Sequence, residues 1–522
     1  MASSRMKMMK MEKTPAIMIQ GTGSNVGKSI LTAALCRIFL EDGYRVVPFK
    51  VQNMALNAYV TRDGLEMSRA QALQAQACRI DPDVRMNPIL IKPTREDGSQ
   101  VIVMGKARPV AGWGEYTAMK PGLLPVIREA YDSLASEADL VVLEGAGSPA
   151  EINLMENDIV NMKAAEMADA PVLLAGDIDA GGVFAGLVGT LALLPPHQAV
   201  RIKGFILNKF RGNREILSPG LLKIREITGR PVLGVVPFLE GLLLPEEDSV
   251  SLKAGRTPLL EKRFEGDGKK RCRIVVFDLP KIANFTDLDP FYGEPDVEIL
   301  FFPVGKKLSS LPFVPDALIL PGSKNVVGDL AALRKSGLDE EIIDYAAGGG
   351  IVVGLCGGFQ MLGEAVLDPH GLENGPGEDS PGLGLLKMKT VLEKEKRLAQ
   401  VEAVHIQSGE TLRGFEMHHG RSSGEPGREI FRDVGGCPGN RLGGSDPTGR
   451  VWGSYLHGIF ESDRFRRWFI DQIREKKGLP PLKEVQASYD VEKTLARLAL
   501  SVRKEMDMKA VYGLIGPIGK RG

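Results

Sequence analysis

The feature of this sequence that most constrains its fold is a glycine-rich run, GTGSNVGKS, at residues 21–29. An apolar stretch (16–19) precedes it, and helix-forming residues (30–36) follow. A strand, a glycine-rich turn and a helix in this order bind phosphate, because backbone N–H groups and the helix N-terminus converge on the anion. The loop is one residue longer than the standard form, with Thr22 where glycine is usual. The predicted nucleotide-binding residues are Gly21, Thr22, Gly23, Ser24, Asn25, Val26, Gly27, Lys28 and Ser29.

Polar residues at the ends of other predicted strands extend this first site. Ligands of open α/β folds bind where parallel strands end, and Gln52, Asn53, Glu144 and Asn208 follow such strands. Glu144 is predicted to bind Mg²⁺ with Ser29, because this ion prefers hard oxygen ligands; the alternative for Glu144 is a turn or N-cap carboxylate. Asn208 is predicted to contact a nucleobase or, almost equally, to cap a turn. Gln52 and Asn53 are predicted to bind substrate.

A second chemical feature lies at residue 356, where a β-branched strand runs into Cys-Gly-Gly and then into an apolar helix. Glycines permit the strained strand-to-helix turn that projects a nucleophile, and a helix N-terminus favours the thiolate. We therefore predict that Cys356 is a nucleophile, whereas Cys36, Cys78 and Cys272 are expected to be small buried hydrophobes.

A cysteine nucleophile requires a base, and the chain has six histidines. His457 ends a predicted strand and is followed by glycine, which suits a ring held over the nucleophile. His418 and His419 form the other candidate cluster. His457 is therefore the first choice for the base.

Length and composition limit the number of domains, the kinds of partner and the cellular location that we expect. A chain of 522 residues exceeds what one core usually supports, so two or more domains are expected. Basic and acidic residues balance at 66 each, which gives no global attraction to nucleic acid or membrane. No apolar run approaches a membrane span, and five cysteines without a CxxC pair fit a reducing, cytoplasmic location.

Strands alternating with helices on both sides of a charged stretch predict two doubly wound α/β domains. The expected divisions are a disordered N-terminal segment (1–14), a P-loop domain (15–240), a linker (241–270), a cysteine-elbow domain (271–485) and a C-terminal helical tail (486–522).

Seven motifs occur in order along the chain: GTGSNVGKS (21–29), QNMALN (52–57), MNPIL (86–90), DIDAGGVF (177–184), LPGSKN (320–325), CGGFQMLG (356–363) and YLHG (455–458). Together they resemble the cobyric acid synthase family of glutamine-dependent amidotransferases, the CobB/CobQ family. The resemblance covers about residues 15 to 500 and implies a dethiobiotin-synthetase-like ATP domain followed by a class I glutamine amidotransferase domain.

The resemblance also implies a reaction and roles for residues. The family amidates the b, d, e and g carboxylates of adenosylcobyrinic acid a,c-diamide through acyl phosphates, using ATP, Mg²⁺ and ammonia released from glutamine. It implies that Cys356 and His457 are catalytic, that the amides of Gly322 and Gly357 form the oxyanion hole, and that Asp177 joins the Mg²⁺ ligands. Because cobalt arrives inside the corrinoid substrate, no protein-bound cobalt is expected; the oligomeric state stays open, a homo-oligomer included.

Two positions depart from the family pattern. Ile459 stands where triad amidotransferases place a glutamate two residues after the histidine, which suggests either a Cys–His pair without an orienting carboxylate or another acid in that role. Ala180 replaces an expected arginine.

Three alternative functions share part of this pattern. Cobyrinic acid a,c-diamide synthase has the same arrangement of two domains, but the motifs at 52–57 and 86–90 favour the cobyric acid synthase family. An enzyme that amidates a cell-wall precursor would normally use a separate glutaminase. A ParA- or MinD-like nucleotide switch shares the extended phosphate loop but needs no cysteine elbow.

Overall fold

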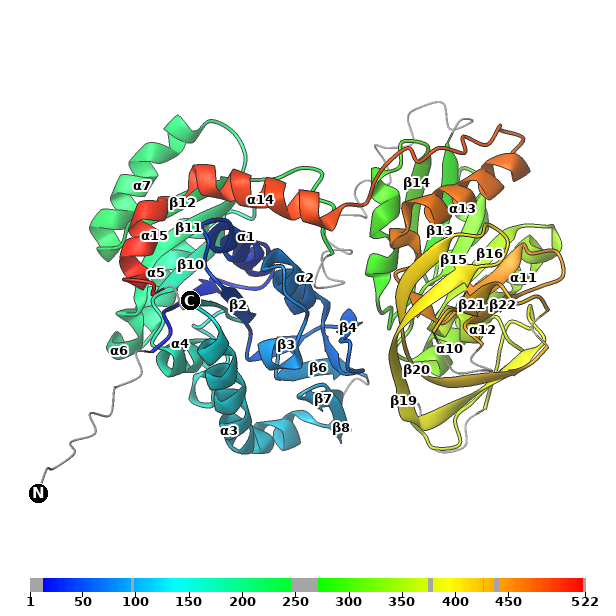
Figure 1. Ribbon diagram of the computed structural model, residues 1–522, viewed down its shortest axis with the longest axis horizontal. Coiled ribbons are helices and arrows are strands. Elements are labelled where there is room, and N and C mark those ends of the chain that lie inside the picture. Colours follow the sequence, from blue (N-terminus) through cyan, green and yellow to red (C-terminus); the bar gives the residue numbers. More distant parts are fainter. Residues whose placement is uncertain are drawn as a thin grey trace, which may run out of the picture.

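The computed structural model describes residues 13–94, 98–245, 271–373, 379–425, 427–435 and 441–519. The predicted N-terminal segment (1–14) and linker (241–270) lie almost wholly outside these residues. Figure 1 shows two lobes, with the phosphate-loop domain on the left and the cysteine-elbow domain on the right. Within the described residues, no helix combines the length and apolarity needed to cross a membrane.

The first domain is built on a parallel six-stranded sheet in the order β12-β11-β10-β1-β9-β2. Alternate residues of β1 face two separate cores: Ile17 and Ile19 pack with α1, and Met18 packs on the opposite side with α3. Buried parallel strands covered by helices on both faces form a doubly wound fold, as predicted. The elements are β1 (Ala16–Gly21), β2 (Val46–Phe49), β9 (Leu140–Glu144), β10 (Val172–Asp177), β11 (Ile202–Phe210), β12 (Val232–Pro237), α1 (Lys28–Glu41), α3 (Trp113–Glu137), α4 (Met162–Ala168), α5 (Val183–Leu193) and α7 (Arg214–Thr228).

An insertion after β2 faces the second domain (Figure 1). It comprises a small sheet in the order β3-β6-β7-β8, the hairpin of β4 and β5, and the helix α2. Ser68 starts α2 as its N-cap, because its side chain accepts a hydrogen bond from the N–H of Ala70 (3.3 Å). The bounds are β3 (Gln52–Met54), β4 (Ala58–Val60), β5 (Glu66–Ser68), β6 (Ile89–Pro93), β7 (Ser99–Val103), β8 (Lys106–Ala111) and α2 (Arg69–Ala77).

The second domain has a six-stranded sheet in the order β14-β13-β15-β16-β23-β22, parallel except for β22. A further sheet, β18-β17-β19-β20-β24, departs from the expected doubly wound pattern because its long strands β19 and β20 pair antiparallel through a short turn. The bounds are β13 (Cys272–Asp278), β14 (Val297–Pro303), β15 (Ala317–Leu320), β16 (Ile351–Leu355), β17 (Ala365–Leu367), β18 (Ser380–Pro381), β19 (Met388–His405), β20 (Thr411–Gly424), β22 (Gly443–Ser445), β23 (Val451–Ser454), β24 (Leu456–His457), η3 (Phe285–Gly293), α10 (Val326–Ser336), α11 (Leu338–Ala347), α12 (Gly357–Met361) and α13 (Asp463–Lys476).

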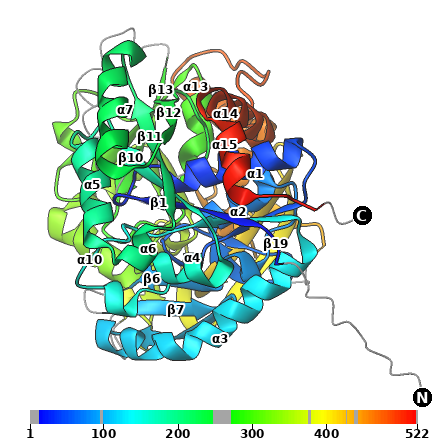
Figure 2. The ribbon, with the colours of Figure 1, turned by 90° about the vertical axis from the view of Figure 1, so that its left-hand side faces the viewer.

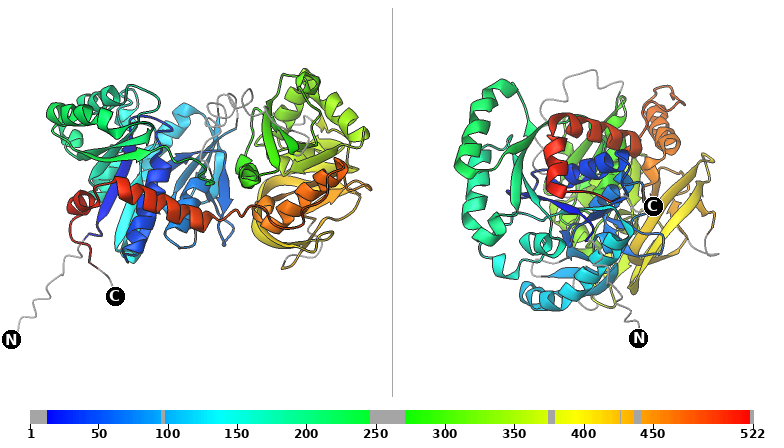
Figure 3. Two further views of the ribbon diagram at one scale, coloured as in Figure 1. Left: turned by 90° about the horizontal axis from the view of Figure 1, so that it is seen from above. Right: turned by 60° about the vertical axis from the view of Figure 1, so that its left-hand side comes forward.

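The C-terminal helices α14 (Val491–Glu505) and α15 (Met508–Ile515) return to the first domain. Figures 1 and 3 show α14 running from the second lobe back across the first, and Figure 2 shows it beside α1. Leu495, Leu498 and Val502 are fully buried in the same core as the apolar face of α1. The end of the chain therefore completes the core of the domain with which the chain began.

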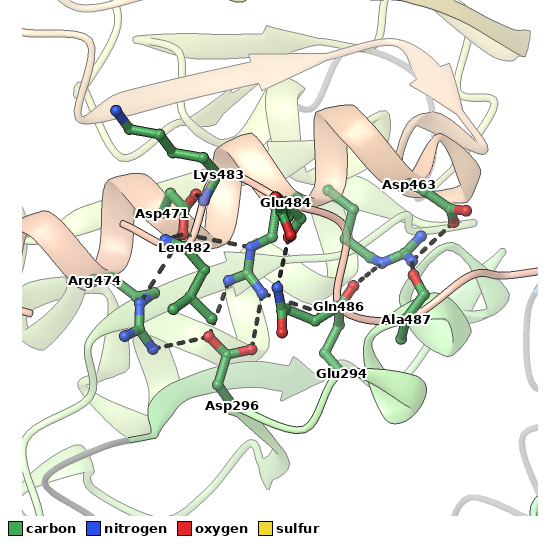
Figure 4. A network of polar contacts seen from close by, with 12 residues as sticks. Glu294, Asp296, Asp463, Asp471, Arg474, Leu482, Lys483, Glu484, Gln486 and Ala487 are labelled. Carbon is green, nitrogen blue, oxygen red and sulfur yellow. Dashed lines mark hydrogen bonds and ion pairs between the residues drawn. The ribbon is translucent and has the colours of Figure 1, made fainter. Parts of the chain in front are cut away.

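A buried ionic network fixes the start of this return (Figure 4). Arg466 donates to Glu294 (2.7 Å) and to the carbonyl of Ala487 in the segment that leads to α14 (2.7 Å). Arg467 donates through both terminal nitrogens to Asp296 (3.0 Å each). These buried charges are paired through directional hydrogen bonds. They therefore hold the segment that leads to α14 against the second domain.

Candidate active sites

The phosphate loop lies between β1 and α1, as predicted. The ammonium of Lys28 donates to the carbonyls of Gly23 (2.8 Å) and Gly147 (3.0 Å), so it points along the concave side of the loop. Gly27 has a φ of 95°, a conformation that side chains rarely adopt. The loop is thus arranged around Lys28 as an anion-binding turn.

Asn208 supports this loop from beneath. Its amide nitrogen donates to the carbonyl of Val26 (2.8 Å), and a Cβ at Gly27 would collide with that nitrogen. Of its two predicted roles, this geometry matches support of a turn; contact with a nucleobase remains a prediction.

Glu144 is almost completely buried at the end of β9 and accepts four hydrogen bonds. Ser29 Oγ (2.7 Å) and Lys50 Nζ (2.9 Å) donate to its Oε1. Gln74 (2.5 Å) and Gln71 (3.3 Å), both on α2, donate to its Oε2. A hydroxyl and a carboxylate side by side are hard oxygen ligands that fit Mg²⁺. Sequence reasoning did not find Lys50 or the two glutamines.

Asp177 occupies the other flank of the loop. Lys209 donates to its Oδ2 (2.7 Å) and also to the carbonyl of Asn25 (2.7 Å), so this pair braces the loop. Strands β9 and β10 lie on opposite sides of β1, about 10 Å apart at two strand spacings. Asp177 and Glu144 therefore end strands on opposite sides of β1, and the role of Asp177 as a Mg²⁺ ligand stays a prediction. In the part of the chain that the structure describes, no group of three acidic, histidine or cysteine side chains could hold a metal.

The two predicted substrate residues differ in their surroundings. Asn53 is buried and donates to Ser68 Oγ (2.5 Å) and to Gln71 Oε1 (3.2 Å), which places it in the hydrogen-bonded chain behind the phosphate site. Gln52 is partly exposed and accepts a hydrogen bond from the Tyr116 hydroxyl. Gln52 is therefore the one of the two with access to a ligand.

Cys356 stands at the strand-to-helix turn between β16 and α12. Its backbone is strained, with φ 48° and ψ −101°, and its side chain is buried. A Cβ at Gly358 would clash with the carbonyl of Leu320, so only glycine fits this close turn. The thiol donates to the carbonyl of Met417 (3.6 Å). The backbone geometry is that of a nucleophile elbow.

His457 contacts Cys356 and is oriented by an acid that sequence reasoning did not identify. Its Nδ1 bonds Asp287 Oδ2 (2.7 Å), and Asp287 Oδ1 accepts from the N–H of Gly458 (2.8 Å). Burial alone would lower the pKa of His457, but the charges of Asp287 and Cys356 outweigh it and raise the pKa to about 10. Position 459 is a fully buried core isoleucine. The expectation of a pair without an orienting carboxylate is thus wrong, and the alternative, another acid, describes the site.

The other histidine candidates are engaged elsewhere. His418 bonds Glu416 (3.2 Å) and stacks on Tyr455. His419 bonds the carbonyl of Glu393 (3.0 Å), and burial lowers its pKa to about 3. Neither has the carboxylate-oriented contact with Cys356 that His457 has.

A cavity of about 510 Å³ joins this triad to the first domain. Gly322 and Gly357, the predicted oxyanion-hole residues, line it together with Cys356 and His457. Its opposite wall comes from the insertion of the first domain, from Leu65 and Glu66 to Val110. The site of Cys356 and His457 is therefore bounded by both domains.

A charged cluster ties the two domains at this cavity. Glu66 pairs with Lys92 of its own domain (2.5 Å) and with Lys396 of the second domain (2.5 Å). Burial would raise the pKa of Glu66, but the charges of Lys396 and Lys92 hold it far below its usual range. Burial lowers the pKa of Lys92 to about 8. The carboxylate therefore stays ionised between two cations.

Comparison with known proteins identifies both domains of the chain. Residues 17–251 match the CobQ/CobB/MinD/ParA nucleotide binding domain, and residues 273–465 match the CobB/CobQ-like glutamine amidotransferase domain. The chain is 48% identical to the cobyric acid synthase of Nitratidesulfovibrio vulgaris, over 97% of this chain and 99% of that protein. It is 45% identical to the cobyric acid synthase of Syntrophobacter fumaroxidans, over 96% of this chain and 98% of that protein.

A longer relative contains the same unit. The adenosylcobalamin biosynthesis bifunctional protein CobDQ of Leptospira interrogans is 47% identical over 98% of this chain, which spans 58% of that protein. With two relatives matched along nearly their whole length and both domains recognised in order, the chain belongs to the cobyric acid synthase family.

Proposed function

We propose that this protein amidates the b, d, e and g carboxylates of adenosylcobyrinic acid a,c-diamide, with ATP as phosphoryl donor and glutamine as nitrogen donor. The observation that carries the proposal is the Cys356–His457–Asp287 triad, whose Cys356 and His457 line a cavity with its other wall in the phosphate-loop domain. The corrinoid acceptor rests on the family to which the chain belongs. The proposed reaction takes place in the cytoplasm.

In the glutaminase half, the Cys356 thiolate attacks the side-chain amide carbon of glutamine. The amides of Gly322 and Gly357 stabilise the resulting oxyanion. When the carbon–nitrogen bond breaks, His457 transfers its Nε2 proton to the leaving nitrogen, which departs as ammonia. Water then hydrolyses the glutamyl thioester and restores the thiol. Asp287 holds the ring and stabilises its charge throughout.

In the synthetase half, the phosphate loop binds ATP and Lys28 offsets negative charge on the transferring phosphoryl group. Ser29 and Glu144 would hold Mg²⁺, which when bound would neutralise phosphate charge. The substrate carboxylate becomes an acyl phosphate, and ammonia displaces phosphate to form the amide. Lys50 pairs with Glu144 (2.9 Å) at the inner end of this site. Cobalt enters with the substrate.

A mass-spectrometric amidation assay tests the proposal. Purified protein is incubated with the adenosylated a,c-diamide, ATP, Mg²⁺ and glutamine, and Cys356→Ala is run in parallel with glutamine or with ammonium. We expect four successive mass decreases of about one dalton each, because –OH is replaced by –NH₂; the variant should lose them with glutamine and regain them with ammonium. Cobyrinic acid as acceptor tests the a,c-diamide synthase alternative. Glutaminase activity without any mass change would refute the corrinoid acceptor.

A further inference from the structure

Asn284 of the second domain contacts both domains at once. Its side-chain Oδ1 accepts a hydrogen bond from the backbone N–H of Ala58, on β4 of the first domain (3.0 Å). Its Nδ2 lies 3.1 Å from Nε2 of His457. The residue is buried and has a φ of 51°, in the left-handed region that asparagine tolerates better than most residues. A single side chain thus joins a backbone group of one domain to the catalytic ring of the other.

The hydrogen-bond chemistry fixes the orientation of this amide. The Ala58 N–H can only donate, so the atom beside it must be the amide oxygen, and the NH₂ group must face His457. Because that NH₂ group can only donate, the ring nitrogen opposite it must accept, which requires an unprotonated Nε2. The proton of the ring then lies on Nδ1, facing Asp287. The hydrogen bond from Asn284 therefore requires a neutral imidazole.

Catalysis needs the other protonation state, because the leaving nitrogen receives its proton from Nε2. Burial disfavours that imidazolium, but the charges of Asp287 and Cys356 favour it and raise the pKa of His457, so the hydrogen bond from the Asn284 NH₂ group opposes them. An imidazolium Nε2–H would face the Asn284 NH₂ group, donor against donor. The conflict ends when the amide turns its oxygen towards the ring, which breaks the bond to Ala58. The Cys356 thiol also donates to the main-chain carbonyl of Met417 (3.6 Å).

We propose that Asn284 is a positioning residue that couples the two active sites. While Ala58 holds its oxygen, its NH₂ group occupies Nε2 of His457 and keeps the glutaminase idle. When β4 shifts, the amide turns, accepts from the imidazolium and releases Cys356 for attack. This inference rests on the glutaminase proposed above.

A continuous path leads from the phosphate site to Ala58. Ala58 pairs with Ser68 across the β4–β5 hairpin, and Ser68 is the N-cap of α2. From the same helix, Gln71 and Gln74 reach Glu144 beside the phosphate loop. One helix and one hairpin therefore separate the carboxylate proposed to bind Mg²⁺ from the backbone group that holds Asn284.

The test is the variant Asn284→Asp, because a carboxylate can accept from both Ala58 and the imidazolium and removes the competing donor. We expect glutaminase activity measured without ATP and corrinoid to rise about tenfold, because a tenfold change in rate corresponds to roughly the free energy of one hydrogen bond. The stimulation of this activity by ATP and corrinoid should fall by the same factor. Iodoacetamide labelling of Cys356, read by peptide mass spectrometry, should extend to lower pH than in the unmodified protein. Asn284→Gly, which also tolerates positive φ, should show the same rise in basal activity.

Gln400→Leu is the matched control, because Gln400 also crosses the interface to β4. It donates to the carbonyl of Val60 (2.7 Å) and to the Tyr59 hydroxyl (2.9 Å) and does not contact His457. Ammonium-dependent amidation verifies that each variant is folded. An unchanged basal rate in Asn284→Asp, or an equal rise in Gln400→Leu, would overturn the coupling role while leaving the glutaminase intact. Absence of glutaminase activity in every form would overturn the proposed function as well.

Discussion

Replacing Asp287 by asparagine should show how much of its effect on His457 comes from orienting the ring and how much comes from the negative charge of the carboxylate. The carboxylate makes two short contacts, to His457 Nδ1 (2.7 Å) and to the N–H of Gly458 (2.8 Å). An asparagine oxygen keeps one acceptor but removes the charge that favours the imidazolium. A hydrogen bond between charged groups contributes about 1.5–3 kcal/mol, and about 1.4 kcal/mol is a factor of ten in rate. We therefore expect kcat/KM for glutamine to fall about 10- to 150-fold.

The assay compares glutamine-dependent with ammonium-dependent amidation in Asp287→Asn and in the matched variant Asp289→Asn. Asp289 is also buried on η3, two residues away, and its charge acts on Tyr489. The loss should be confined to Asp287→Asn and to glutamine, and the alkaline limit of the glutaminase profile should move to lower pH because the pKa of His457 falls. Unchanged kcat/KM in Asp287→Asn, with that limit unmoved, would refute the role given to this carboxylate.

Three further predictions concern other parts of the machinery. Cys356→Ser should lose glutamine-dependent amidation more than about 1,000-fold but retain the ammonium-dependent reaction, as product mass will show. Lys28→Ala should lose amidation with either nitrogen source by about 100-fold or more, whereas Lys28→Arg should retain part of it, measured at saturating ammonium. Glu66→Gln leaves Lys92 and Lys396 without their carboxylate and should destabilise the protein by about 3–5 kcal/mol at neutral pH, measured by denaturant unfolding. Because the native pKa of Glu66 is depressed, this difference is present above the ordinary value of 4.5 and should shrink as the pH falls below it; a difference independent of pH would contradict the ion pair.

The two reactive loops could be predicted from sequence because their chemistry uses contiguous residues. A phosphate loop requires glycines, a lysine and a hydroxyl within a few positions, and an elbow requires small residues around its nucleophile. Lys28 and Cys356 could therefore be identified from the residues next to them. The strain at Cys356 and the close packing of Gly358 are the physical reasons for the pattern that the sequence displays.

Residues brought together by the fold could not be predicted in the same way. Asp287 lies 170 positions before His457 and comes from a short helix after β13, where no spacing rule relates it to the histidine. The only sequence signal is an acid within an apolar stretch, FTDLDPF (285–291), which is equally typical of a structural turn. Asp177 also ends a parallel strand, and the sequence does not show that this strand lies on the opposite side of β1 from Glu144. The order of strands in the sheet decides which strand ends lie side by side, and a local sequence pattern does not specify that order.

The strength of the domain interface bears on how the two sites can communicate. Separating the lobes would break the buried ion pair of Glu66 with Lys396. It would also expose the mixed apolar cluster in which Ala58 and Val60 of one domain pack with Phe415 of the other. Turning the Asn284 amide breaks about one hydrogen bond, roughly 1 kcal/mol. Turning one amide disrupts fewer contacts than separating the lobes, so the proposed coupling needs only a local shift of β4 and leaves the contacts between the domains in place.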